Sequence, residues 1–278
     1  MIEFTYKNKI GSIAMGGTSP IKITAYDGLG IPDPEYVTVA FATENGVTTV
    51  GQKDGTRTIT LTMDFCDPNG FIRRKMSRVF HTEGELFCIT NVCRRKIGCK
   101  LLKMSGFEHK GANIYVVTVQ LICDYPYFSD FYEVRKDLYS QKNLVTDTFT
   151  LPCVFTTRIN RAVIHNIGDK YVYPIIEITN NSDASSAAEL FYIENKTTGA
   201  KISINHKFLN GETLTFDLAT RRIKSNISGD VTSEITNDTD LSAFYFDVGD
   251  NVIDFVTTAS RYVSAQAVFL REYYSAEV

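Results

Sequence analysis

The sequence contains no tryptophan, only four histidines, and no hydrophobic run of the length that a membrane-spanning helix requires. A span needs about 20 consecutive apolar residues, so we expect no membrane insertion. The lack of tryptophan weakens an interpretation as a sugar-binding protein, although tyrosine can also stack on sugars. The histidines are scattered without partners at metal-ligand spacing, and we therefore expect no metal site.

Motifs of catalysis and cofactor binding are also missing. There is no glycine-rich dinucleotide or phosphate loop, no Gly-x-Ser-x-Gly and no His-Glu-x-x-His. Glu83 and Glu85 lie close together on one expected turn, whereas a catalytic carboxylate pair needs opposed groups across a cleft. The sequence therefore predicts a protein that is not an enzyme and that binds no cofactor.

The charge is mild, with a net value of −3. Specific nucleic-acid binding needs concentrated cationic side chains, so we expect none. Residues 1–140 hold 17 basic and 15 acidic side chains, and the remainder hold 12 and 17, which fits two units with different surfaces. The six cysteines form no Cys-x-x-Cys pair and lie mostly in hydrophobic runs, which favours buried, reduced thiols in a protein folded in a reducing cytosol.

Residues 57–65 show the clearest strand pattern in the sequence. Ile59, Leu61, Met63 and Phe65 alternate with polar residues, which is typical of a strand with one buried face. Residues 71–80 then change period, because the apolar residues there recur at helical spacing. We therefore expect a strand, a turn and a short helix, with Asn69 near the N-cap of that helix.

The polar sides of this strand and helix are candidates for contact with another subunit. The charged helix side has two interpretations, a solvated surface or a contact with a neighbouring copy. The candidate interface residues are Arg57, Thr58, Thr60, Thr62, Arg73, Arg74 and Arg78.

Strands separated by turn residues recur about every ten residues in the second half, and no parallel-sheet helix pattern occurs. The predicted fold class is mainly β. We expect an N-terminal β-barrel-like or split-barrel domain with one inserted helix (residues 1–137). A linker (residues 138–157) would lead to a C-terminal antiparallel β-sandwich of jelly-roll or galectin-like type (residues 158–278).

Several segments, taken in order, resemble the distal tail protein family of siphophages and prophages. They include Arg57–Leu61, the run Asp124-Tyr125-Pro126-Tyr127-Phe128, and Phe149-Thr150-Leu151-Pro152. Further matches are His165–Asp169 leading into Tyr173–Ile178, Leu209–Leu214, and Phe246–Ile253. Val248 stands where the family usually has proline, and cysteine is unusually frequent. The matching segments extend over nearly the whole chain.

The resemblance implies a structural role in the tail tip of a virion. It implies a homo-hexameric ring, made by the N-terminal domain, that joins the tail tube protein to the tail-tip hub or baseplate. The C-terminal domain would offer a platform for receptor-binding components. The implied location is the virion tail tip, after folding and assembly in the cytoplasm of a bacterial host.

Two other functions are compatible with a β-rich chain. The first is a carbohydrate-binding β-sandwich that recognises cell-surface glycans through Tyr171, Tyr173 and Tyr192. The second is a hydrolase on a jelly roll, for which the sequence offers no carboxylate pair.

Overall fold

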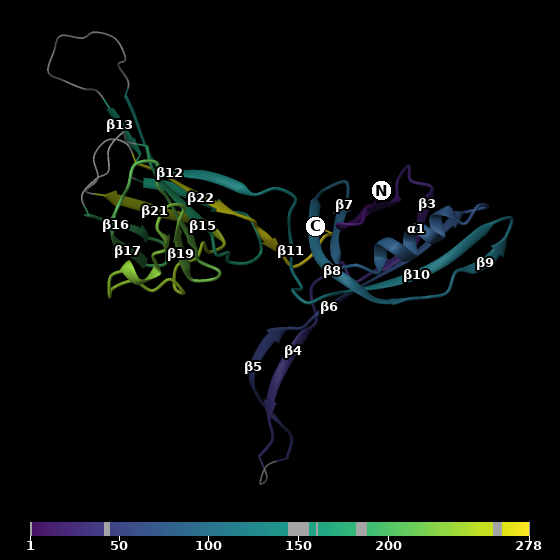
Figure 1. Cartoon of the computed structure of the whole chain (residues 1–278). Coiled ribbons are helices and arrows are strands. Elements are labelled where there is room, and N and C mark those ends of the chain that lie inside the picture. The colour runs from purple at the N-terminus through teal and green to yellow at the C-terminus, as the bar shows by residue number, and fades with distance from the viewer. Residues whose placement is uncertain are drawn as a thin grey trace. The chain divides into compact units, whose positions relative to one another are not determined.

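A computed structural model of the chain describes residues 2–41, 45–143, 156–159, 161–181, 188–257 and 263–277. The chain folds into two compact units (Figure 1). The first unit comprises Met1–Phe131 and Tyr273–Val278, and the second comprises Tyr132–Glu272. Sheets of antiparallel strands dominate both units, which confirms the predicted mainly β fold class. The helices of the described residues are too short to cross a membrane.

The first unit is organised around a large sheet with the strand order β2-β1-β7-β8-β10-β6-β3. These strands are β1 (Glu3–Lys7), β2 (Ser12–Gly16), β3 (Ile21–Asp27), β6 (Arg57–Cys66), β7 (Gly84–Ile89), β8 (Arg94–Met104) and β10 (Ile114–Cys123). Two shorter strands, β9 (Glu108–Gly111) and β11 (Phe128–Asp130), pair with β10 and β8. Because β2 and β3 end this order, no ladder of hydrogen bonds closes the sheet into a complete barrel among the described residues.

Strand β6 has the predicted alternation. Ile59, Leu61 and Met63 are completely buried, because every second side chain of a strand points to the same face. They join side chains from β1, β7 and β10 in a single core. Because the apolar side chains of β6 face the core, the polar side chains that alternate with them lie on the opposite face of the sheet.

Helix α1 (Phe71–Phe80) has the predicted bounds and buries Met76, Val79 and Phe80. Its N-terminus differs from the expectation, because Gly70 holds the N-cap position in the left-handed conformation and Asn69 does not cap the helix. The Asp67 carboxylate instead accepts hydrogen bonds from the N–H groups of Ile72 at 3.2 Å and Arg73 at 3.0 Å. The turn before α1 brings the Asp67 carboxylate close to the first N–H groups of the helix, which have no acceptor within the helix.

Strands β4 (Pro34–Val39) and β5 (Thr48–Asp54) form a separate two-stranded sheet (Figure 1). Every residue of these two strands is exposed except Asp54, which is half-buried. Neither face of this hairpin packs against the core of the first unit. We call residues 34–54 the arm.

The second unit contains two sheets. The larger has the order β13-β12-β22-β15-β18-β19-β20, and the smaller has the order β14-β21-β16-β17. The larger sheet consists of β12 (Val134–Asn143), β13 (Thr156–Ile159), β15 (Ile175–Asn180), β18 (Thr213–Asp217), β19 (Arg222–Ser225), β20 (Gly229–Asp230) and β22 (Val263–Phe269). The smaller consists of β14 (Arg161–Asn166), β16 (Ala188–Asn195), β17 (Ala200–Lys207) and β21 (Gly249–Thr257). Side chains from both sheets share one buried core.

The predicted domain limits need two corrections. The expected linker at 138–157 begins inside β12, which pairs with β22 in the second unit. Leu138 and Tyr139 are buried there, although the polar residues around them gave the segment the composition of a linker. Residues 144–155 lie outside the described part. The chain also returns to the first unit at its end, where Tyr273 and Ala276 join the first core.

Candidate functional site

The structure contradicts the assignment of Arg57 to a subunit interface. Its side chain is only 4% exposed and lies in the same alternating series as Ile59, which faces the core. The guanidinium donates to the main-chain carbonyl oxygens of Gly28, Gly30, Pro126 and Tyr274 at 2.6–2.8 Å. Its carbon atom Cζ also lies 4.7 Å from the ring centre of Phe128. Arg57 therefore joins distant segments of the first unit. Its position in the alternation of β6 already indicates that its side chain is buried.

The three threonines of the predicted interface lie on the opposite face of β6. Thr58 is exposed, whereas Thr60 and Thr62 are half-buried. The hydroxyl of Thr62 lies 3.2 Å from that of Thr118 on β10, and Thr24 donates to the Thr62 carbonyl at 3.1 Å. These residues form an uncharged hydrogen-bonding sheet surface, and its role as a subunit contact stays a prediction.

The three arginines of helix α1 do not act alike. Arg73 donates through Nε to Asp67 at 3.1 Å, and its guanidinium lies 4.0 Å from the ring centre of Tyr115. It is therefore occupied within its own unit. Arg74 and Arg78 are exposed, as is Lys75, so the outward side of the helix remains basic.

The arm is an exposed apolar feature that the sequence pattern did not single out. Tyr36, Val37, Val39 and Val50 are between 39% and 60% exposed. Isolated two-stranded hairpins are marginally stable in water, and exposed apolar clusters mark interaction surfaces. The signal in the sequence was an apolar alternation in residues 36–39 followed by a second β-branched run in 47–50.

Two of the three tyrosines proposed for glycan contact lie together. The ring centres of Tyr171 and Tyr173 are 5.7 Å apart, and Tyr245 joins them at 5.0 Å from Tyr171 and 6.3 Å from Tyr173. Tyr192 is not part of this cluster, and its ring instead lies 4.8 Å from Nζ of Lys201. The sequence pattern does not link Tyr245 to the other two, because it is about 70 residues distant from them.

The main chain under this tyrosine cluster is firmly held. Val172 lies between Tyr171 and Tyr173 in the sequence, and Phe246 follows Tyr245. Both residues are buried, and they exchange two main-chain hydrogen bonds of 2.9 Å. The amide of buried Asn195 donates to the Tyr245 carbonyl at 2.9 Å. The three rings are therefore displayed on a rigid backbone.

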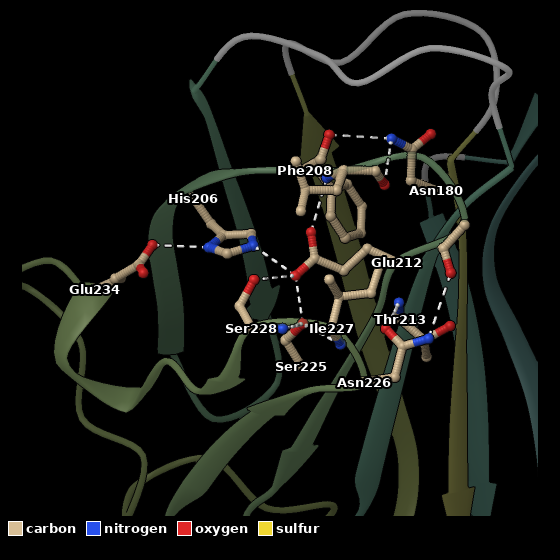
Figure 2. A network of polar contacts seen from close by, with 12 residues as sticks. Asn180, His206, Phe208, Glu212, Thr213, Ser225, Asn226, Ile227, Ser228 and Glu234 are labelled. Atoms are coloured by element: carbon tan, nitrogen blue, oxygen red, sulfur yellow. Dashed lines mark hydrogen bonds and ion pairs between the residues drawn. The ribbon is translucent and has the colours of Figure 1, made fainter.

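A buried polar network lies elsewhere in the second unit (Figure 2). Glu212 is completely buried, and its Oε1 accepts hydrogen bonds from His206 at 3.0 Å, from Ser228 at 3.2 Å and from Ser225. Its Oε2 accepts one from the Leu209 N–H at 2.7 Å. Burial alone would raise the pKa of the Glu212 carboxyl, but these donors outweigh it and hold the pKa below its ordinary value.

The same network is unsuited to nucleophilic catalysis. The second ring nitrogen of His206, Nδ1, lies 2.7 Å from the Glu234 carboxylate (Figure 2). Both imidazole nitrogens are therefore occupied by carboxylates, and Ser225 and Ser228 donate to Glu212 instead of to the histidine. A serine nucleophile requires a base that accepts its proton, so this arrangement supports the fold and not a reaction.

The cysteines are free thiols wherever the structure describes them. Cys88, Cys99 and Cys123 are buried as expected, but Cys66 is exposed. Cys153 lies outside the described residues. Within the described part of the chain, no three histidine, cysteine or acidic side chains are placed to hold a metal ion.

Comparison with known families gives a match in the second unit. Residues 167–267 fit the family described as siphovirus-type tail component, C-terminal domain. This stretch, which lies within the second unit, is therefore similar to the C-terminal domain of siphovirus-type tail components. This match confirms the resemblance to siphophage tail proteins that the sequence motifs indicated.

The fold of the whole chain also has a solved counterpart. The crystal structure of the SPP1 Dit protein, described as a paradigm of the hub adsorption apparatus in phages that infect Gram-positive bacteria, aligns with a TM-score of 0.68. The alignment covers 98% of this chain and 99% of that one, at 12% sequence identity. At this identity the likeness establishes a shared fold over both units.

A second solved structure, the phage P2 baseplate in its activated conformation with calcium, gives a TM-score of 0.49 at 8% identity over 97% of both chains. That similarity is too low to carry an argument. The search of curated protein sequences found no match to this chain.

Proposed function

We propose that this protein is a ring-forming adaptor of a phage tail tip, which joins the tail tube to the tail-tip hub or baseplate. The observation that carries the proposal is the family match of residues 167–267 to a siphovirus-type tail component. A fold shared over both units with a hub protein of the adsorption apparatus supports a position at the end of the tail.

The proposed ring contains six copies of the chain, as the resemblance to distal tail proteins implies. A ring forms when one surface of a subunit binds a different surface of the next and the rotation closes. The exposed arm and the outward basic side of α1 offer two such unlike surfaces on the first unit. The threonine face of β6 offers a third surface, suited to the tube or the hub.

The proposed partners are other copies of this chain, the tail tube protein and the tail-tip hub protein. A receptor-binding protein would attach to the second unit. The protein would fold and assemble in the bacterial cytoplasm and remain in the virion tail tip.

Mass measurement of the purified chain tests this proposal, alone and mixed with the tube and hub proteins of the same phage. The expected species has six times the 31.2 kDa mass of one chain, and electron microscopy should show a ring. A chain that stays monomeric and binds neither protein would overturn the proposal.

A carbohydrate-binding role is the second candidate, favoured by the cluster of Tyr171, Tyr173 and Tyr245. Half-exposed aromatic rings on a rigid backbone can stack on the apolar face of a pyranose. Saturation-transfer NMR with millimolar glucose, galactose and N-acetylglucosamine should show binding that Tyr171→Ala removes and Tyr192→Ala retains. Equal signals from both variants, or no signal from the unmodified chain, would exclude this site.

A further inference from the structure

The two strands of the arm, β4 and β5, carry uncovered apolar side chains. The base of the arm is fixed because Arg57 donates to the carbonyls of Gly28 and Gly30, just before β4, and Tyr127 donates to the Asp54 carboxylate at 2.6 Å. A cross-strand ion pair of 3.0 Å joins Lys53 to Glu35. The arm is thus held at its root, while the apolar residues beyond the root remain in contact with water.

The first unit also has an apolar hollow between α1 and β2. Its volume is about 200 Å³, and it is lined by Ile13, Ala14, Ser19, Pro20, Ile21, Phe71, Ile72, Lys75 and Met76. Phe71 at its rim is 71% exposed. Because both the hollow and the arm are exposed in the same chain, the arm does not fill the hollow of its own unit.

The charges of the two features are opposite. The arm, residues 34–54, contains three acidic side chains and one lysine. Helix α1 contains four basic side chains and no acidic one. Electrostatic complementarity of this kind guides two surfaces together and selects one orientation.

We propose that the arm of one copy docks on the α1–β2 hollow of the next copy, with Val37 and its apolar neighbours against Phe71. This inference rests on the proposed ring and identifies the surface that would build it. Because the arm and the hollow are unlike surfaces, the contact runs head to tail, as ring closure requires. The contact would also bury the apolar residues of the arm, and an isolated two-stranded sheet is only marginally stable without such packing.

The larger hollow of the first unit fits the arm less well. It has a volume of about 680 Å³ and lies near β1, β7, β8 and β10. Its rim includes Lys7, Lys9, Glu83 and Glu85, so charges of both signs surround the opening. Apolar arm residues would displace water from these charges without pairing with them, which is unfavourable.

Two variants of the full chain test the contact. Val37→Glu places a carboxylate on the arm, and Phe71→Glu removes the apolar rim and adds a charge that repels the acidic arm. Both sites are exposed, so folding should be retained, which circular dichroism melting checks. Val92→Glu is the matched control, because Val92 is 76% exposed and lies in neither surface.

Each variant alone should associate at least about tenfold more weakly than the unmodified chain under the conditions in which that chain forms its ring. An equal mixture of the two should give a two-chain complex and nothing larger, because only one intact arm and one intact hollow remain. Normal rings from both variants would overturn the arm contact and leave the ring function standing. A chain that forms no ring with tube or hub would overturn the function itself.

Discussion

Nε2 of His206 lies 3.0 Å from Oε1 of Glu212, so an imidazole contacts a carboxylate that is completely buried in the second unit. Nδ1 of the same ring faces the Glu234 carboxylate at 2.7 Å. The chain near β17, β18 and β19 is therefore joined by a buried polar network in addition to apolar packing.

Replacing Glu212 with glutamine should lower the free energy of unfolding by about 1–3 kcal/mol at pH 7, because His206, Ser225 and Leu209 lose a charged acceptor. Urea denaturation measures this change. Glu234→Gln is the control, since Glu234 is 39% exposed and its loss should cost under about 1 kcal/mol. Equal losses from the two variants would contradict the assigned importance of the buried acid.

The Glu212 carboxylate should make the free energy of unfolding depend on pH. The folded-state pKa of Glu212 lies below its ordinary value of 4.5, so its stabilisation is complete above that pH. It is lost as the pH falls below 4.5 and through the lower folded-state pKa. Urea midpoints measured from pH 6 downward should therefore fall more steeply for the unmodified chain than for Glu212→Gln. Parallel curves would show that Glu212 does not carry this dependence.

Arg57→Met should destabilise the first unit by about 3–5 kcal/mol, because it leaves four carbonyl groups without their donor. Arg74→Met is the matched control on an exposed site and should change stability by no more than about 0.5 kcal/mol. Thermal and urea denaturation of both variants provide the comparison. A mild effect at Arg57 would mean that its hydrogen bonds are not important for folding.

Asp67→Ala should cost about 1–2 kcal/mol, because the N–H groups of Ile72 and Arg73 lose their acceptor. Asn69→Ala should have little effect, since that residue does not cap α1. The two urea midpoints decide between the cap seen in the structure and the cap expected from sequence. A larger loss at Asn69 would reverse the assignment.

Gly28→Ala should cost at least about 1–3 kcal/mol. Gly28 has a φ of +86°, and an added Cβ would lie 2.1 Å from the Thr58 carbonyl oxygen. Gly30→Ala is the control, because no atom lies within 4 Å of its added Cβ. Thermal unfolding of the pair measures the difference, and similar melting temperatures would exclude a tight approach at Gly28.

Much of the first unit could be predicted from local pattern. The burial of Ile59 and Leu61 and the bounds of α1 depend on the spacing of apolar residues within one element. Arg57 has the charge of an interface residue, but it occupies a position in the buried series of β6. Tyr245 could not be joined to Tyr171 and Tyr173, because their proximity depends on a main-chain pairing between Val172 and Phe246.

By itself the sequence determined the mainly β class, the helix at residues 71–80 and the resemblance to a tail protein family. These features depend on periodicity and on short motifs, which neighbouring residues specify together. Only the tertiary structure decided that Arg57 is buried, that the chain end returns to the first unit, and that the arm is uncovered. Such features depend on contacts between distant residues, as in the hydrogen bond from Arg57 to the Tyr274 carbonyl across 217 positions of the chain.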